Sequence, residues 1–415
     1  MNARRINASE VEDNLVNLRQ LTFEVTDACN LKCKYCGYGE LYYGYDGRHS
    51  SFMSIKQVQP LMDYLFALWK DSRPRAEKPL TYFSFYGGEP LLNMKFIKEM
   101  VDFIEKSDIQ RTAAFSMTTN AMLLDKYMDY LVDKDFHLLI SLDGDKKGQG
   151  YRVDHNGRNS FDIVFSNIKE MQRAYPDYFK RMVNFNSVLH NRNSVQSTYE
   201  FIKKEFGKKP RISELNNSDV RPEKRQEFDI VYRNKIESLK EARDYKKISE
   251  DMFYEDPEKS DLILFIHKYS GNVFRNYNDL FFDDCSRNYT PTGTCSPFAK
   301  KMFVTVNGKI LQCERISHAF SCGHVNQEGL SLNLDAIANT FNAYLDKMQP
   351  SCSACFRKKS CIQCMYYIES LHDKRPACNG FMDKASFDSY SSACLGYLKQ
   401  NPELYEKIMN EVVID

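Results

Sequence analysis

The chain has 415 residues, of which 42% are hydrophobic and 27% are charged. This composition is typical of a globular protein with two or three domains and excludes disorder for most of the chain. Lys plus Arg number 57 and Asp plus Glu number 56, for a net charge of +1. That balance argues against a protein whose main task is to bind nucleic acid or a membrane surface.

The longest apolar runs, residues 64–69 and 262–266, are too short to span a bilayer, and residues 1–12 lack the apolar core of a signal peptide. We therefore expect a cytoplasmic protein.

Between residues 21 and 216, short β-type runs alternate with amphipathic helical runs. The predicted strands are residues 21–25, 80–85, 113–118, 137–142 and 182–189. The predicted helices are residues 55–69, 94–104, 124–132, 161–171 and 195–206, with Ser54 as the N-cap of the first. This alternation predicts a parallel sheet, either doubly wound or closed toward a barrel.

The second half of the chain carries different signals. Residues 219–261 are highly charged with a helical pattern, which favours a solvated connector between domains over a binding patch. Asn307 and Gly308 lie between two β-type runs, the pattern of a tight hairpin within residues 302–312. Asn401 and Pro402 predict the N-cap and first residue of a closing helix that runs to about residue 413.

Thirteen cysteines are unusual for a cytosolic chain, where disulfides are rare. Cys29, Cys33 and Cys36 follow the first predicted strand, and the other ten lie between residues 285 and 394. Three thiolates at the CxxxCxxC spacing fit one face of a [4Fe–4S] cluster and leave one iron open for another ligand. The alternative is a zinc site completed by His49.

The segment VTDACNLKCKYC, residues 25–36, resembles the cluster-binding motif of radical SAM enzymes. The resemblance implies that the open iron binds the amino and carboxylate groups of S-adenosylmethionine (AdoMet). Reductive cleavage of AdoMet would then give methionine and a 5′-deoxyadenosyl radical, which abstracts a hydrogen atom from the substrate. The implied fold is α/β, a partial (β/α)6 TIM-like barrel over about residues 20–216.

Three further segments support this resemblance. Residues 87–89 match the family's GGE motif, in which glycines allow close backbone approach and the carboxylate faces the methionine ammonium. Residues 116–120 are similar to the TNG segment, although Ala121 replaces the usual glycine, and residues 140–144 are similar to the SLDG segment. The implied cofactor-binding residues are Tyr35, Gly87, Gly88, Glu89, Ser116, Asn120, Ser141, Asp143 and Arg152. Each motif follows a predicted strand, and ligands of parallel α/β folds gather at the carboxyl ends of strands.

The cysteines of the second half resemble a SPASM domain, which holds two auxiliary [4Fe–4S] clusters. The resemblance assigns the first cluster to Cys295, Cys313 and Cys364, with Cys285 as the fourth ligand. It assigns the second cluster to Cys352, Cys355, Cys361 and Cys378, with Cys394 as the alternative to Cys378. Only two residues separate Cys361 from Cys364, where the family has three, and Cys322 has no assigned role. On spacing alone, paired CxxC motifs also indicate a zinc ribbon.

Glu314, directly after Cys313, is the candidate catalytic residue. In relatives that oxidise a serine or cysteine side chain, an acidic residue at this place is a candidate base. The alternative is an exposed glutamate at a strand end.

The resemblance implies a maturase that forms an oxidative cross-link, a thioether or a carbon–carbon bond, in a ribosomally made precursor peptide. The alternatives are a sulfatase-maturing enzyme that makes formylglycine and a non-catalytic metal-containing partner that binds a peptide. An electron donor of the flavodoxin or ferredoxin type is expected. About 20 residues precede the first strand, too few for a peptide-binding domain, so we expect the substrate's leader to bind residues 219–261 or a separate protein.

The expected divisions of the chain follow from these motifs. They are an N-terminal extension (1–20), the barrel (21–216), a charged helical connector (217–284), the SPASM domain (285–398) and a C-terminal helix (399–415).

Overall fold

The computed structural model describes residues 4–270 and 291–412, so Cys285 lies outside the described residues. The chain forms two compact units. We call Ala8–Asp251 with Pro297–Ile337 the barrel unit, and Met1–Asn7, Met252–Ser296 and Ala338–Asp415 the cysteine-rich unit. The predicted connector, residues 217–284, is thus divided between the two units.

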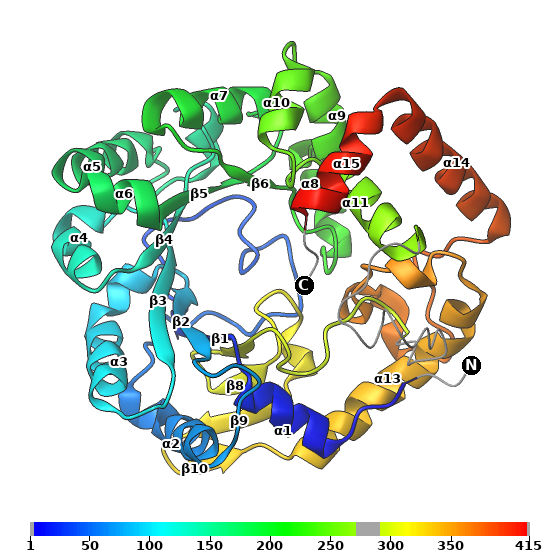
Figure 1. Cartoon of the computed structure of the whole chain (residues 1–415). Coiled ribbons are helices and arrows are strands. Elements are labelled where there is room, and N and C mark those ends of the chain that lie inside the picture. Colours follow the sequence, from blue (N-terminus) through cyan, green and yellow to red (C-terminus); the bar gives the residue numbers. More distant parts are fainter. Residues whose placement is uncertain (1–3, 271–290, 413–415) are drawn as a thin grey trace. The chain divides into compact units, whose positions relative to one another are not determined.

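The barrel unit is built on parallel strands in chain order, and Figure 1 shows them along an arc. The strands are β1 (Gln20–Thr26), β2 (Leu80–Gly87), β3 (Thr112–Thr119), β4 (His137–Ser141), β5 (Val183–Val188) and β6 (Arg211–Ser213). Each is paired in parallel with the next, so their carboxyl ends share one edge. This arrangement confirms the expected partial barrel and its predicted strands.

Helices cover the outer side of this arc (Figure 1). They are α2 (Ile55–Asp71), α3 (Met94–Lys106), α4 (Leu124–Asp133), α5 (Phe161–Ala174), α6 (Pro176–Met182) and α7 (Val195–Phe206). Each longer helix buries one apolar stripe, as Phe96, Ile97, Met100, Val101 and Ile104 of α3 illustrate. Ser54 stands at the N-cap of α2 as predicted, but its side chain makes no capping bond. The sequence patterns missed α6 and the N-terminal helix α1 (Ala8–Val16).

The sheet continues past β1 into the second half of the chain. The added strands are β7 (Met302–Val304), β8 (Lys309–Leu311), β9 (Gly323–Asn326) and β10 (Gly329–Ser331). β7 pairs in parallel with β1, and β7 to β10 are antiparallel to one another. The predicted hairpin is confirmed, with Gly308 at φ +84°, a conformation that favours glycine.

The predicted connector is helical, with α8 (Arg225–Val231), α9 (Lys235–Lys240) and α10 (Tyr245–Asp251) in the barrel unit. It is more than a solvated link, because Phe228 and Val231 of α8 are fully buried. The sequence pattern did not reveal these few apolar positions, because most of the surrounding residues are charged.

The cysteine-rich unit is helical. It contains α11 (Pro257–Tyr269), most of α13 (Leu334–Ala354), α14 (Lys384–Gln400) and α15 (Pro402–Glu411). Ile408 of α15 packs with Phe253, Leu262, Ile263 and Ile266, which forms an apolar core for this unit. The closing helix predicted from Asn401 is therefore present. No helix in the described parts of the chain is long and apolar enough to cross a membrane.

Candidate active site

The loop with the first three cysteines leaves the carboxyl end of β1 and is held by backbone pairing to residues 151–154. The amide of Lys32 donates to the carbonyl of Val153 at 2.7 Å, and that of Lys34 donates to the carbonyl of Tyr151 at 3.1 Å. Leu31 forms a β-bridge with Asp154. These contacts fix the backbone between the cysteines before any metal binds.

Cys29, Cys33 and Cys36 are partly buried on this loop, and their thiols lie close enough to influence one another. Burial raises the pKa of Cys29 to about 11 and that of Cys33 to about 12. Thiols with such values stay protonated at neutral pH, and a metal centre must displace their protons to bind them as thiolates. The Asn120 side-chain amide donates to the Cys29 sulfur at 3.8 Å. Three thiols at this spacing fit a [4Fe–4S] cluster with one open iron.

Gly87 and Gly88 bring the end of β2 against the start of the cysteine loop. The Gly88 amide donates to the Thr26 carbonyl at 2.8 Å. A Cβ on Gly88 would lie 2.0 Å from the Ala28 carbonyl oxygen, and one on Gly87 would lie 2.2 Å from the Thr26 carbonyl oxygen. Only glycine fits at either position, because the obstacles are backbone atoms.

Glu89 ties the end of β2 to the end of β3. Its buried carboxylate accepts hydrogen bonds from the Thr119 hydroxyl at 2.7 Å, the Asn120 amide at 2.8 Å and the Leu91 amide at 3.1 Å. Burial raises the pKa of Glu89 to about 7 despite these donors. The structure therefore gives Glu89 a positioning role, and its contact with a methionine ammonium stays a prediction. Ala121 follows at φ +60°, which explains why a glycine is favoured there.

Tyr35, Asp143 and Arg152 form one buried network below the cysteine loop. Arg152 pairs with the Asp143 carboxylate through Nε at 2.9 Å and Nη2 at 3.0 Å. The Tyr35 hydroxyl donates to the same carboxylate, and the Val188 amide donates to it at 2.8 Å. Burial alone would raise the pKa of Asp143, but Arg152 holds it well below its ordinary value. The predicted cofactor contacts of these residues stay predictions, since the network already satisfies much of their hydrogen bonding.

His190, which the sequence analysis missed, completes this network. Its ring stacks on Tyr35 at 5.5 Å between centroids, and its Nε2 lies 3.7 Å from Asp143 Oδ2. No motif surrounds His190 in the sequence, so only the parallel pairing of β4 with β5 brings it here.

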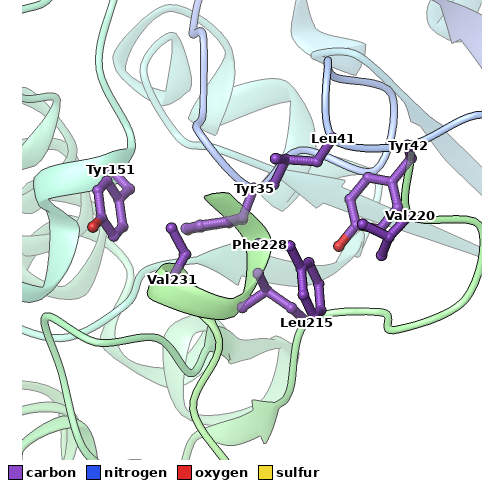
Figure 2. Close-up of a cluster of buried hydrophobic side chains, with 8 residues drawn as sticks. All are labelled: Tyr35, Leu41, Tyr42, Tyr151, Leu215, Val220, Phe228 and Val231. Atoms are coloured by element: carbon purple, nitrogen blue, oxygen red, sulfur yellow. The ribbon is translucent and has the colours of Figure 1, made fainter. Parts of the chain in front are cut away.

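An apolar cluster anchors the far side of the loop (Figure 2). Its buried members are Tyr35, Leu41, Tyr42, Tyr151, Leu215, Val220, Phe228 and Val231. They come from the cysteine loop, from the turn after β4 that holds Tyr151, from the segment after β6 and from α8. The charged segment therefore helps to fix the loop that carries the predicted cluster ligands. Burying side chains of this size contributes roughly 1.5–3 kcal/mol each.

A cavity of about 240 Å³ lies among the strands of the barrel unit. Its lining includes Gln20, Thr22, Ser84, Tyr86, Ser116, His137, Asn184, Lys301 and Glu314. Ser116 and Ser84 share a hydrogen bond of 2.6 Å, and Gln20 donates to Ser84 at 2.8 Å. Ser141, at the end of β4, is half-buried and is not part of this lining.

Glu314 faces this cavity and is paired with Lys301, whose ammonium lies 3.0 Å from each carboxylate oxygen. Burial alone would raise the pKa of Glu314, but Lys301 holds it below its ordinary value. The Cys313 sulfur lies 3.7 Å from Glu314 Oε2. The sequence alternative of an exposed glutamate is wrong, since the side chain is 19% exposed. Lys301 carried no sequence signal, because it is the second of two adjacent lysines before a strand.

In the cysteine-rich unit, the four residues assigned to the second auxiliary cluster line one small cavity of about 20 Å³. They are Cys352, Cys355, Cys361 and Cys378. Four thiols around one space fit a fully ligated iron–sulfur cluster. Cys394 is not in this lining, whereas the predicted Cys378 is.

The first auxiliary cluster stays a prediction. Burial and the neighbouring Cys295 thiol both raise the pKa of Cys364, so these two thiols lie near each other. Cys313 belongs to the barrel unit. Among the described residues, no three His, Cys, Asp or Glu side chains are close enough to ligate a single ion.

The chain is similar to known proteins over much of its length. Residues 23–204 match the model of the Radical SAM superfamily. The chain is 28% identical over 194 residues to a cysteine-type anaerobic sulfatase-maturating enzyme of Clostridium novyi, covering 46% of this chain and 49% of that protein. It is 22% identical over 349 residues to the radical SAM cyclopropyl synthase TigE of Paramaledivibacter caminithermalis, covering 76% of this chain and 69% of that protein. The match thus spans about half the length of the clostridial relative.

A solved structure, native anSMEcpe with bound AdoMet, has a similar fold, with a TM-score of 0.60 and 16% identity over 95% of this chain and all of that one. The same protein has also been solved with AdoMet and a peptide. Residues 23–204 of this chain are therefore a radical SAM domain, followed by a cysteine-rich region. The chain is similar to anaerobic sulfatase maturases and to TigE, and enzymes with a radical SAM domain use a [4Fe–4S] cluster and AdoMet.

Proposed function

We propose that this protein is a radical SAM maturase that removes two hydrogens from a residue of a peptide or protein substrate. The observation that carries the proposal is the cavity of the barrel unit, which is lined by polar groups and includes the Lys301–Glu314 pair. A cavity of this size accommodates one or two side chains but not a large cofactor beside them. Relatives named as sulfatase maturases, and a solved relative with a bound peptide, support a peptide substrate.

When bound, AdoMet and its reduced cluster supply a radical that takes one hydrogen atom, and an auxiliary cluster supplies an acceptor for the second electron. Cys29, Cys33 and Cys36 would hold the first cluster. The second hydrogen must leave as a proton. Glu314 is ionised and faces the cavity, so its carboxylate accepts that proton, while Lys301 orients it.

Two products remain open for this chemistry. One is a cross-link, either a thioether or a carbon–carbon bond, in a ribosomally made precursor peptide. The other is formylglycine, the sulfatase-type outcome, which the similarity to the clostridial sulfatase maturase favours. Both begin with the loss of two hydrogens. An electron donor of the flavodoxin or ferredoxin type, and a separate leader-binding protein, belong to the same proposal.

The test is anaerobic co-expression with the short open reading frame nearest the gene, and in parallel with a sulfatase peptide that carries Cys or Ser. The matched control is the Cys29→Ala/Cys33→Ala/Cys36→Ala variant. A mass loss of two hydrogens per site that this variant abolishes supports the proposal, and fragmentation distinguishes a cross-link from formylglycine. In the Cys peptide, formylglycine shows a further mass change, because water replaces the sulfur of the thioaldehyde by oxygen and hydrogen sulfide leaves. AdoMet cleavage without change in either peptide would contradict it.

A further inference from the structure

Arg48 lies between β1 and α2, on a segment that is pinned beside the cysteine loop. The carboxylate of Asp27 accepts hydrogen bonds from the His49 amide at 2.7 Å and the Ser51 amide at 2.6 Å. Asp27 stands two residues before Cys29. The backbone next to Arg48 is therefore fixed at the start of the loop that carries the three cysteines.

The guanidinium of Arg48 has one edge, formed by Nε and Nη2, that makes no hydrogen bond to the described residues. Its Nε and Nη2 are both buried, and neither has a hydrogen-bond partner among the residues that the structure describes. Arg152 offers a direct comparison, because the same two nitrogens there are filled by the two oxygens of Asp143 at 2.9 and 3.0 Å. A buried guanidinium edge without acceptors is costly, and its natural partner is a carboxylate bound through two parallel hydrogen bonds.

Two more buried polar atoms without a partner in the described chain lie nearby, the Tyr38 hydroxyl and His318 Nε2. The Arg48 guanidinium lies over the Tyr38 ring, 5.0 Å from its centroid. The His318 ring is 6.5 Å from that of Tyr38. The unpaired atoms thus belong to side chains in contact with one another, and their hydrogen-bonding capacity is mostly that of donors.

The chain's own acids near Arg48 are committed elsewhere. Asp27 holds the two amides described above. Asp46 pairs with Lys309 at 2.7 Å and with His318 at 3.3 Å. Glu24 accepts from the Val306 amide at 3.0 Å, and burial raises its pKa to about 7, so it is only partly ionised at neutral pH. Arg48 interacts electrostatically with Glu24, but none of these carboxylates accepts a hydrogen bond from its Nε or Nη2.

We propose that Arg48 binds a carboxylate group of a ligand through Nε and Nη2, with the Tyr38 hydroxyl as a further donor. Two ligands at this loop carry a carboxylate. One is AdoMet, through its methionine portion, and the other is an acidic residue of the peptide substrate. The second source depends on the proposed function, whereas the first depends only on the radical SAM domain.

The first experiment measures equilibrium binding of AdoMet and of decarboxylated AdoMet to the reconstituted holoenzyme under anaerobic conditions. The proteins are wild type, Arg48→Met, Arg48→Lys and the control Arg158→Met, whose guanidinium is already paired with Asp154 at 2.8 Å on the surface. If AdoMet is the ligand, Arg48→Met weakens its binding roughly tenfold or more, as expected for a charged hydrogen-bonded pair. Decarboxylated AdoMet then binds wild type and Arg48→Met equally. Arg48→Lys keeps the charge but not the planar edge and shows an intermediate loss.

The second experiment uses the peptide found by co-expression and its version with Asp and Glu replaced by Asn and Gln. If the peptide is the ligand, Arg48→Met leaves AdoMet binding unchanged and weakens binding of the acidic peptide only. Thermal unfolding of each variant checks that the variant is folded. If Arg48→Met does not fold, Arg48→Lys replaces it in the binding measurements. If neither affinity depends on Arg48, the proposal is overturned. If AdoMet binding depends on Arg48 while no peptide is modified, the proposed function fails and this inference stands.

Discussion

Tyr35 and Asp143 are 108 residues apart in the sequence, yet the hydroxyl of the first donates a hydrogen bond to the carboxylate of the second. Tyr35 belongs to the cysteine loop, and Asp143 follows the last residues of β4. Both are buried, and the same carboxylate also binds Arg152. The bond therefore connects the predicted cluster loop to the opposite part of the strand edge.

Replacing Tyr35 by Phe should destabilise the protein, because a buried carboxylate loses one donor. The expected loss is about 1–3 kcal/mol in the free energy of unfolding, measured by denaturant titration. The loosened loop should also lower the iron retained after mild chelation. The control is Tyr254→Phe, an exposed tyrosine of the other unit that should leave both quantities unchanged. Equal iron retention in Tyr35→Phe and wild type would contradict a positioning role for the hydroxyl.

The buried pair of Asp143 and Arg152 should show strong coupling. Arg152→Met leaves a buried negative charge and should cost about 3–5 kcal/mol, and Asp143→Asn a comparable amount. The double variant should cost clearly less than the two losses added together, because it removes both charges. Denaturant unfolding of the four proteins measures this coupling. Additive losses would mean that the two residues act independently.

The close backbone approach at Gly88 predicts that Gly88→Ala and Gly37→Ala differ in the iron content of the first cluster. Gly88→Ala places a Cβ against the Ala28 carbonyl and should displace the cysteine loop, with loss of most of the iron of the first cluster. Gly37→Ala, directly after Cys36, meets no atom within 4 Å and should keep it. Iron content and the electron paramagnetic resonance signal of the reduced cluster distinguish the two. Equal iron content in the two variants would show that the cysteine loop tolerates a Cβ at position 88.

Glu24 should make stability depend on pH. Burial raises its pKa in the folded state from 4.5 to about 7. The folded state then binds a proton more tightly than the unfolded state, so this stabilising contribution is full below pH 4.5 and is lost as pH rises to about 7. The change amounts to about 3 kcal/mol at most. Glu24→Gln retains an oxygen for the Val306 amide and should remove this part of the slope.

The difference in unfolding free energy between wild type and Glu24→Gln, measured from pH 4 to 8, checks this prediction. A difference that stays constant over this range would show that Glu24 keeps its ordinary pKa. Glu89 has a similar raised pKa, so a residual slope in the Glu24→Gln protein is expected.

The cavity of the cysteine-rich unit predicts a separate metal centre. Replacing Cys352 and Cys355 by Ala should remove about four irons per chain and leave binding of AdoMet to the first cluster intact. Iron and zinc analysis of the purified protein checks the metal. One zinc ion lost in place of iron would support the zinc-ribbon alternative. Replacing Cys394, outside the cavity lining, is the matched control.

Much of the barrel could be predicted because its strands appear in the sequence as short β-type runs between amphipathic helices. Residues 195–206, for example, were predicted as a helix and form α7 with those bounds. Strand β6 was not predicted because its three residues are too few to show a periodic pattern, and helix α6 was not predicted because its seven residues form less than two full turns. The pairing of β7 with β1 was not predicted either, because the two strands lie about 280 residues apart and strand pairing gives no local sequence pattern.

The sequence by itself determined which chemistry this protein is predicted to perform, through the spacing of Cys29, Cys33 and Cys36, the glycines before Glu89, and the second group of cysteines. Such spacings constrain ligands because a few residues of backbone limit where thiols can point. Only the tertiary structure decided how the motif residues act on one another. It buried Glu89 and Asp143 among donors, placed Lys301 on Glu314, and left the Nε and Nη2 atoms of Arg48 without a hydrogen-bond partner among the described residues. These relationships depend on side chains from distant strands that meet in a low-dielectric interior. There, one neighbouring charge decides whether a buried polar group has an electrostatic partner.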